Sequence, residues 1–470
     1  MTNEIEQPKS LKVILSDLML KDVPAYANKI YYSLGFLSMT SFLVLLISGV
    51  VLAFEGPNWW LTTASGLYFR SIHLWAAQAF IFFIFLHLLI VFLTSGYRPP
   101  RRLTWVIGAL MFFLVLIEAE FGYGLRGDFS SQWRGLQASD LYNGSGLGHI
   151  INNLNYAQIY GIHIIVIPLI ILGLLFLHYL LVKVRGIATP FKKVPYRIVK
   201  ADHQVLFLRG TILVVVILLL AVVFKSPFII RTSIQNVAND DPTLMAGTLI
   251  TEIDHTSDTA TYLDTIDPYT YDTKEIYVTK PFQQYAQISN SQDFLSFLES
   301  QNQATQQKEI SDAKNYFNNN GNINTVADNP VIATVSALTK LAQNGTYESI
   351  LQAESGNNDN QTYVTRFLSD TGILDTKAES LKMSTGQYGM LHEEEGILPP
   401  GAWWLAPLGF LDNTVLVNDP NQDRDGAEIL SLLILLLIAF PYIPYFNKIP
   451  EKIGLDKFIW KDKKIPIENI

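Results

Sequence analysis

The segment Arg70-Ser71-Ile72-His73-Leu74-Trp75 opens an almost uninterrupted apolar stretch that ends at His87, and a second such stretch runs from His163 to His178. At a rise of about 1.5 Å per residue, these steps of about 14 and 15 residues cover about 21 and 22 Å of helix. Fourteen residues fall short of four full turns by about 40°, and fifteen overshoot them by about 60°. The spacing predicts two membrane-spanning helices, each with two histidines on one face and one histidine near each membrane surface.

The four histidines together favour a metal-binding interpretation. A single histidine inside a membrane span often only hydrogen-bonds to a neighbouring helix, although ionisable residues there are costly and usually functional. Two helices with histidines at matching depths can hold two metalloporphyrins, each iron taking one imidazole from each helix. Zinc would need more ligands at each depth, and the chain has no cysteine to supply them. The pattern predicts two bis-histidine haems.

Two pairs of glycines repeat the spacing of the first histidine pair. Gly35 and Gly49 lie in the first apolar segment, and Gly108 and Gly122 lie in the third. Glycine allows the closest backbone approach, which the edge of a macrocycle between helices requires. Ordinary helix crossings also use small residues, so each pair alone would be weak evidence. Together they support the haem interpretation.

Several motifs resemble the haem-binding half of cytochrome b, the subunit of respiratory bc-type complexes and of their photosynthetic plastoquinol counterparts. The resemblance covers about residues 10–190, and the longer spacing of the second histidine pair is similar to the photosynthetic branch. The motifs are Tyr32-Ser33-Leu34-Gly35, Arg70-Ser71-Ile72-His73, Arg101-Arg102-Leu103-Thr104-Trp105, Gly122-Tyr123 and Leu177-His178.

The resemblance implies a role for each of these positions. His73 and His163 would hold an outer haem b, and His87 and His178 an inner one. Arg70 and Arg101 would pair with haem propionates by charge-assisted hydrogen bonds; for Arg70, snorkelling to lipid headgroups is the alternative.

Composition predicts an all-α membrane protein. Of 470 residues, 49% are hydrophobic, and runs of about 18–24 residues nearly free of charge are typical of membrane spans. Such runs lie at residues 31–54, 72–93, 103–121, 159–182, 207–224 and 429–446. We expect a four-helix dihaem bundle, two further transmembrane helices and a soluble, mainly helical insertion.

Charge predicts the orientation. Between Arg231 and Glu428 there are 28 Asp and Glu against 10 Lys and Arg, a balance of −18, although the whole chain carries only −8. The Lys and Arg excess lies in residues 98–102, 183–200 and after 448, and the positive-inside rule places such loops in the cytoplasm. Six spans then leave both termini inside and residues 231–428 outside an energy-transducing bacterial or archaeal cytoplasmic membrane.

These observations predict six consecutive regions. They are an amphipathic N-terminal surface helix (1–30), the dihaem bundle (31–190), an inner loop with the fifth span (191–230), an acidic extracytoplasmic insertion (231–396), an interfacial segment with the sixth span (397–446) and a cytoplasmic tail (447–470). Within the insertion we expect short strands or coil to about Val278, and then helices near Gln283–Phe317, Pro330–Leu351 and Tyr363–Leu381.

The absence of cysteine limits the cofactors. A covalent haem c and a cysteine-bound iron–sulfur cluster are excluded from this chain. Photosynthetic relatives attach an extra haem to a cysteine at the position of Ser33, which serine cannot do. We therefore expect iron–sulfur or c-type cytochrome partners, besides membrane lipid and a second copy of the chain, and no nucleic acid.

Quinone or quinol is the expected substrate. Protons must reach reduced quinone at the inner face, where Ser33, Lys183, Arg185, Asp202 and His203 are candidate pocket residues; contact with anionic lipid is an equal alternative for the basic ones. His203 beside Asp202 is the best titratable pair.

The outer site departs from the family pattern. In relatives the loop at residues 123–160 walls the outer quinol site, and Trp133, Leu136 and Leu141 are available here to enter the membrane interface. Arg126-Gly127 replaces the family's Pro-Trp, Gln158 replaces an Arg, and Ala402 stands where the family has a proton-accepting Glu.

Glu118 and Glu120 could replace that missing carboxylate. Both precede Gly122 near the outer end of the third span, where desolvation favours proton acceptance. Pairing with Arg126 or Arg134, or snorkelling, is the alternative.

Three functions remain open at this point. The first is a quinol-oxidising subunit of a bc-like enzyme. The second is a haem conduit or docking subunit without its own outer quinol site, and the third is an assembly protein with structural haems.

Overall fold

The computed structural model describes residues 22–189, 196–263, 271–289, 303–319, 322–324, 328–356, 359–391 and 398–454. The predicted surface helix at Ser10–Leu20 and the tail beyond residue 454 lie outside these residues. The described residues belong to two compact units. The first comprises Met1–Glu118, Val166–Ser226 and Leu432–Ile470, and the second comprises Ala119–Ile165 and Pro227–Ser431.

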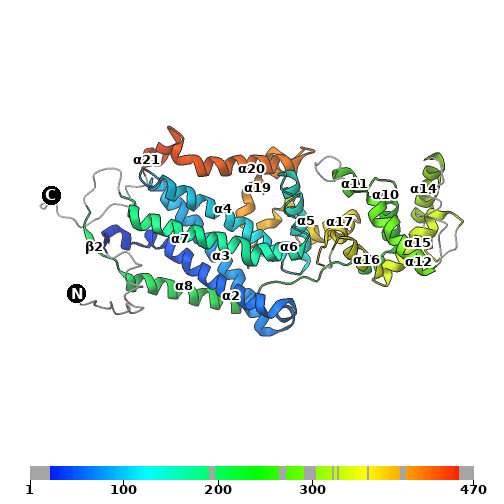
Figure 1. Ribbon diagram of the computed structural model, residues 1–470, viewed down its shortest axis with the longest axis horizontal. Helices are drawn as coiled ribbons and strands as arrows, with labels where there is room; N and C mark the ends of the chain where they lie inside the picture. Colours follow the sequence, from blue (N-terminus) through cyan, green and yellow to red (C-terminus); the bar gives the residue numbers. More distant parts are fainter. Residues whose placement is uncertain are drawn as a thin grey trace, which may run out of the picture. The chain divides into compact units, whose positions relative to one another are not determined.

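Among the described residues, six helices are long and apolar enough to cross a membrane (Figure 1). Their bounds are α2 Leu34–Thr62, α3 Ala64–Leu93, α4 Arg102–Gly124, the combined helix Tyr156–Arg185, α8 His203–Val223 and α20 Gln422–Ala439, whose span is Arg424–Tyr442. Large apolar side chains such as Phe54, Leu169 and Phe176 remain exposed on them, as lipid-facing side chains would. The chain is an all-α integral membrane protein, which confirms the predicted fold class.

Local sequence sets the end of the first span. Within α2, Gly56 adopts a φ of 79°, and Pro57 follows it. A proline inside a helix removes a backbone donor and clashes with the preceding turn, and glycine accepts the positive φ that the resulting break needs. The predicted span ended two residues earlier, at Phe54.

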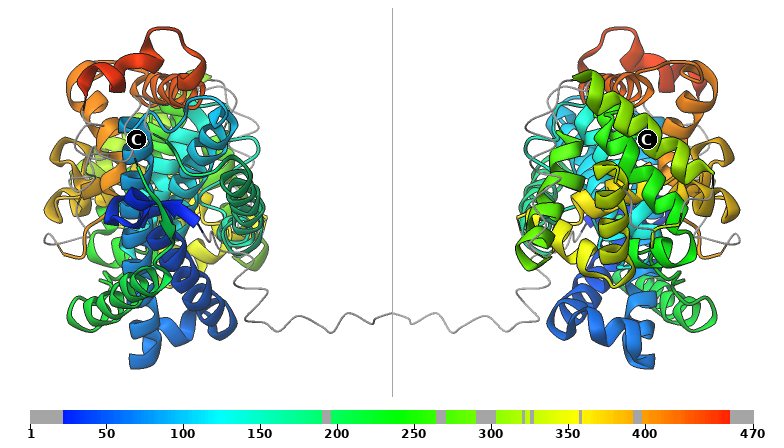
Figure 2. Two further views of the ribbon diagram at one scale, coloured as in Figure 1. Left: turned by 90° about the vertical axis from the view of Figure 1, so that its left-hand side faces the viewer. Right: turned by 90° about the vertical axis from the view of Figure 1, so that its right-hand side faces the viewer.

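Helices α2, α3 and α8 form one packed group in the first unit (Figure 1), and the left view of Figure 2 looks along their axes. Ile72, Trp75 and Ala76 of α3 pack against Ile217 and Ala221 of α8. The Trp75 indole also donates a hydrogen bond to the Phe224 carbonyl at 2.8 Å. The fifth span is thereby fixed against the second.

The sixth span is anchored by aromatic side chains. Phe440 lies against Phe92, Tyr97 and Trp105. The Trp105 indole donates to the Leu437 carbonyl at 2.9 Å. Helix α20 ends at Ala439, earlier than the predicted 446, because Pro441 leads into a single 3₁₀ turn at Phe440–Tyr442.

A short antiparallel sheet closes one end of the first unit. Strand β1 (Asp22–Pro24) pairs with β2 (Ile198–Lys200), so that Val23 lies opposite Val199. This pairing joins the segment before the first span to the segment before the fifth.

The second unit is a helical domain with its own apolar core. Its main helices are α5 Phe129–Gly144, α9 Ile234–Asp240, α10 Pro242–Ile253, α11 Asp258–Leu263, α12 Lys280–Ser289, α14 Gln303–Asn318, α15 Pro330–Gln343, α16 Thr346–Glu354, α17 Thr362–Asp370, α18 Ile373–Ser380 and α19 Ala406–Phe410. The predicted insertion at 231–396 lies within this unit, which extends beyond it on both sides.

The predicted strands or coil before Val278 are wrong, because this region begins with helices α9, α10 and α11. Asp241 caps α10 by accepting from the Thr243 and Leu244 amides, and Pro242 occupies its first turn; both are helix start signals. Met245, Leu249 and Ile253 then repeat every four residues and are buried. This helical period outweighs the polar composition around it.

The segment between the third and fourth spans is also more ordered than predicted, because it contains α5. Asp128 caps this helix by accepting from the Ser131 amide. Trp133 and Leu136 lie in the apolar core of the second unit, and the Trp133 indole donates to the Met383 carbonyl at 3.0 Å. Both side chains are used inside the protein rather than at the membrane interface.

Two buried carboxyl groups lie together in this core. Glu252 of α10 accepts a hydrogen bond from the Ser257 hydroxyl at 2.7 Å, and Asp370 of α17 accepts from the Thr259 amide at 2.8 Å. Burial, reinforced by the neighbouring Asp370, raises the pKa of the Glu252 carboxyl to about 9. At neutral pH this carboxyl therefore keeps its proton.

This pair makes the stability of the second unit depend on pH. The folded state keeps a proton that the unfolded chain releases above the ordinary carboxyl pKa of 4.5. The free energy of unfolding should therefore fall as pH rises from about 4.5 towards 9. Glu252→Gln mimics the protonated form and should remove most of this slope.

Hydrogen exchange of α10 and α17 peptides in the full chain, corrected for intrinsic rates at pH 6 and pH 8, measures this effect. Glu379→Gln, at an exposed carboxyl of the same unit, is the control and should keep the slope. An unchanged slope in Glu252→Gln would contradict the assignment.

Candidate functional site

The first histidine pair lies on α3, and each of its members faces a glycine of α2. A Cβ at Gly49 would lie 3.2 Å from Cε1 of His73, and a Cβ at Gly35 would lie 3.3 Å from Cε1 of His87. These distances are tighter than ordinary side-chain contacts, so the imidazoles occupy space that only glycine leaves open.

The second pair repeats this arrangement between α4 and the combined helix Tyr156–Arg185. A Cβ at Gly108 would lie 3.2 Å from Cε1 of His178, and a Cβ at Gly122 would lie 3.1 Å from Cε1 of His163. Each of the four predicted glycines thus faces one of the four predicted histidines. All four imidazoles are partly buried.

His163 lies in a π-turn, η3 (Ile162–Val166), between α6 (Tyr156–Gly161) and α7 (Ile167–Arg185). Pro168 in the first turn of α7 has no backbone N–H to offer the preceding turn. A π-turn contains one residue more than an α-turn. The segment from His163 to His178 is one residue longer than the segment from His73 to His87. The π-turn accommodates this additional residue.

Within the first unit, His87 and His178 are close enough to interact electrostatically, although they come from different helices. His73 belongs to the first unit and His163 to the second. Among the described residues there is no cluster of three or more His, Asp or Glu side chains of the kind that holds a bare metal ion.

Ser48 is a site residue that sequence analysis missed. Its hydroxyl lies 3.0 Å from Nδ1 of His73, and its side chain is buried. A polar residue directly before Gly49 was the available signal, because the residue beside a close-approach glycine also faces the neighbouring helix.

The two predicted propionate partners differ in their surroundings. Arg70 is buried in α3. Arg101 precedes α4, and its guanidinium donates to the carbonyls of Gly186 and Ile187 at 3.1 and 2.8 Å. Arg101 thereby joins the start of α4 to the chain after α7.

Three of the candidate inner-pocket residues lie near one another. The Ser33 hydroxyl accepts a hydrogen bond from Arg209 of α8. Asp202 caps α8 by accepting from the Val205 amide, and His203 is the first residue of that helix. Asn28 joins these groups, because its carbonyl accepts from Arg209 and its side chain accepts from the Asp202 amide.

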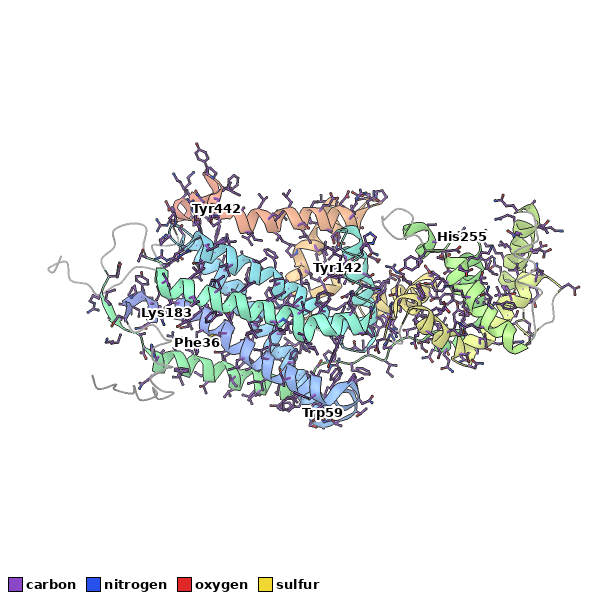
Figure 3. The ribbon with its side chains drawn as sticks, viewed as in Figure 1. Phe36, Trp59, Tyr142, Lys183, His255 and Tyr442 are labelled. Carbon is purple, nitrogen blue, oxygen red and sulfur yellow. The ribbon has the colours of Figure 1, made fainter. Side chains whose placement is uncertain are left out.

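Sequence analysis missed Arg209, although a charged residue inside an apolar span is a functional signal by default. Lys183 and Arg185 lie in the last turn of α7, and Nη1 of Arg185 is buried without a hydrogen-bond partner. Figure 3 shows Lys183 and Phe36 at the same end of the first unit, with Trp59 at the opposite end.

Glu118 and Glu120, near the C-terminal end of α4, are partly buried. Arg134 is the positive charge that acts on Glu120, and its guanidinium also lies 4.2 Å from the centre of the Tyr123 ring. Arg126, the other suggested partner, forms an ion pair with Asp128 at 2.8 Å. The Glu118 side chain lies on the same helix within the first unit.

Ala402, which sequence analysis compares with a proton-accepting glutamate, is fully buried in the second unit. Trp404 nearby packs against Tyr123 with ring centres 6.1 Å apart.

Three kinds of comparison find known proteins that are similar to this chain. A family model described as cytochrome b(N-terminal)/b6/petB matches residues 78–242. A cytochrome b6 of Gracilaria tenuistipitata var. liui is 29% identical over 207 residues, which covers 39% of this chain and 96% of the relative. A solved structure described as a hyperthermophilic respiratory Complex III covers 73% of this chain and 95% of its own, at 17% identity and a TM-score of 0.37.

Proposed function

We propose that this chain, a divergent member of the cytochrome b family, is the redox subunit of a quinol-linked membrane oxidoreductase and carries electrons across the membrane through two bis-histidine b haems. The observation that carries this proposal is the contact between each of four histidines and one of four glycines. Haem b is the cofactor that the similarity to cytochrome b6 leads us to expect.

The residues present fit two haems. Four imidazoles would supply one iron ligand each, and the glycines leave space beside every ring. His73 and His163 would hold the outer haem, and His87 and His178 the inner one. When bound, haem b supplies a one-electron Fe(III)/Fe(II) couple.

Arg70, which is buried, and Arg101, which is half-buried, support the binding of haem propionates at the sites. Arg70 lies three residues before His73, about one turn away on the same helix, and it would carry the positive charge that an outer propionate needs. Arg101 donates to the carbonyls of Gly186 and Ile187. Its remaining guanidinium N–H groups would donate to a propionate of the inner haem.

The network around Arg209 supports an inner quinone pocket. A carbonyl or phenolate oxygen of a quinone would accept from Arg209 or the Ser33 hydroxyl. His203 and Asp202 at the start of α8 would supply the protons that reduction consumes. Lys183 and Arg185 would hold anionic lipid at the same face.

A second candidate function is an electron conduit without its own outer quinol site. Ala402 and the Arg126–Asp128 ion pair favour it, because both replace groups that relatives use in quinol oxidation. Glu118 and Glu120 favour the quinol-oxidising alternative, since a partly buried carboxylate can accept a proton at the outer end of α4.

The orientation and partners follow from charge. Basic loops place both termini in the cytoplasm, and the −18 balance of residues 231–428 would steer a basic or cation-bearing redox subunit to the outer face. Iron–sulfur and c-type cytochrome proteins are the expected partners, since this chain has no cysteine for either centre.

The ligand assignment predicts the effect of His87→Ala. Loss of one imidazole should remove one of two b-type redox transitions and leave the other largely intact, as measured by optical redox titration of the purified complex. His149→Ala, at an exposed histidine, should keep both. Absence of protohaem from the unaltered complex would refute the proposed function.

The proton-acceptor hypothesis predicts different effects for Glu118→Gln and Glu120→Gln. One of them should slow quinol-driven haem reduction strongly and change its pH dependence while both haem spectra stay unchanged. Glu55→Gln, at an exposed carboxylate of α2, is the control. Unaltered rates in both variants would favour the conduit.

The docking hypothesis predicts that surface charge retains a partner. Deleting residues 234–395 would uncover Phe129, Trp133 and Leu136 of the shared core, so substitution is the sharper test. A triple variant, Asp240→Asn, Asp312→Asn and Asp328→Asn, removes three exposed carboxylates.

In this variant, copurification of other subunits should fail at lower salt than in the unaltered protein, because fewer charges attract the partner. Lys308→Gln with Lys382→Gln, at two exposed lysines, should retain the partner to equal or higher salt. Identical salt dependence in all three proteins would argue against docking on this surface.

A further inference from the structure

Ser48 and His73 form a buried side-chain hydrogen bond between neighbouring helices. Ser48 lies on α2 and is almost fully buried, and its Oγ lies 3.0 Å from Nδ1 of His73 on α3. The same Oγ lies 2.7 Å from the Val44 carbonyl and 3.1 Å from the Leu45 carbonyl.

The proton count decides which group donates. A serine hydroxyl has one hydrogen, and a backbone carbonyl can only accept. Two oxygen atoms 2.7 Å apart need a hydrogen between them, so the Ser48 hydrogen is directed to the helix carbonyls, with Val44 the nearer. Nδ1 of His73 must then carry the hydrogen of its bond to Oγ, and the lone pair of the neutral ring is left on Nε2.

We propose that Ser48 is a positioning residue that fixes His73 in the Nδ1–H tautomer and presents Nε2 as the ligand atom for the outer haem. This inference rests on the proposed haem function. A hydrogen bond from the far nitrogen of a ligating histidine orients the ring and raises its basicity, which favours the oxidised metal.

A serine stands directly before one of the four glycines that face a histidine. The residues directly before Gly35, Gly49, Gly108 and Gly122 are Leu34, Ser48, Ile107 and Phe121. Three of these are apolar and offer no acceptor from the side chain. Because Ser48 contacts His73, its effect should fall on the outer haem.

The test is a redox titration of both haems in the purified complex, with electron paramagnetic resonance of the oxidised low-spin signals. In Ser48→Ala, the equilibrium of the outer haem should shift about three- to tenfold towards the reduced form, tenfold being about 59 mV for one electron. The inner haem should not shift, and Ser48→Thr, which keeps the hydroxyl, should restore the original potential.

Ser41→Ala is the matched control. Ser41 is also buried on α2 and donates to the Leu37 carbonyl four residues earlier, so its loss tests the helix effect alone and should move neither potential. The affected haem must be the one that survives in His87→Ala.

Unchanged potentials and resonance signals in Ser48→Ala, with full haem content, would overturn the role of Ser48 and leave the proposed function standing. A shift of the inner haem, or a loss of haem that Ser48→Thr does not restore, would also overturn it. A haem-free unaltered complex would instead refute the proposed function itself.

Discussion

Inside a membrane, helices come close to one another only where side chains are small, and in this protein that constraint falls on four glycines that each face an imidazole. The histidine side chains fill the space that the missing Cβ atoms leave. Helix packing and the placement of the histidine side chains therefore depend on the same few positions. A larger residue at any of them would have to displace a ring or separate two helices, so the site cannot change without the bundle changing with it.

The apolar core of the second unit is built from two separate parts of the chain. Helix α5 lies between the third and fourth spans, and it contributes Phe129, Trp133 and Leu136 to an apolar core whose other helices follow the fifth span. Segments far apart in the sequence thereby complete one hydrophobic interior. The acidic segment is a part of this domain and does not form a separate attachment.

The sequence allowed the spans, the histidines and their glycine partners to be predicted, because long apolar runs and a repeated spacing are strong signals. It failed where the signal was a short helix in polar surroundings, as in α9 and α10, whose capping residues outweigh composition. Ser48 and Arg209 were missed for a different reason. Their importance lies in partners 25 and 176 residues away along the chain, and the spacing of residues within one helix does not reveal such pairs.

The π-turn at His163 lets the fourth span contain an additional residue without changing the helix face on which His178 lies. An insertion of one residue in a regular helix rotates everything beyond it by about 100°, which would turn a ligand away from its cofactor. A π-turn confines that change to a single turn. The fourth span can thus contain one residue more between its two histidines than α3 does, while both imidazoles still face glycines of α4.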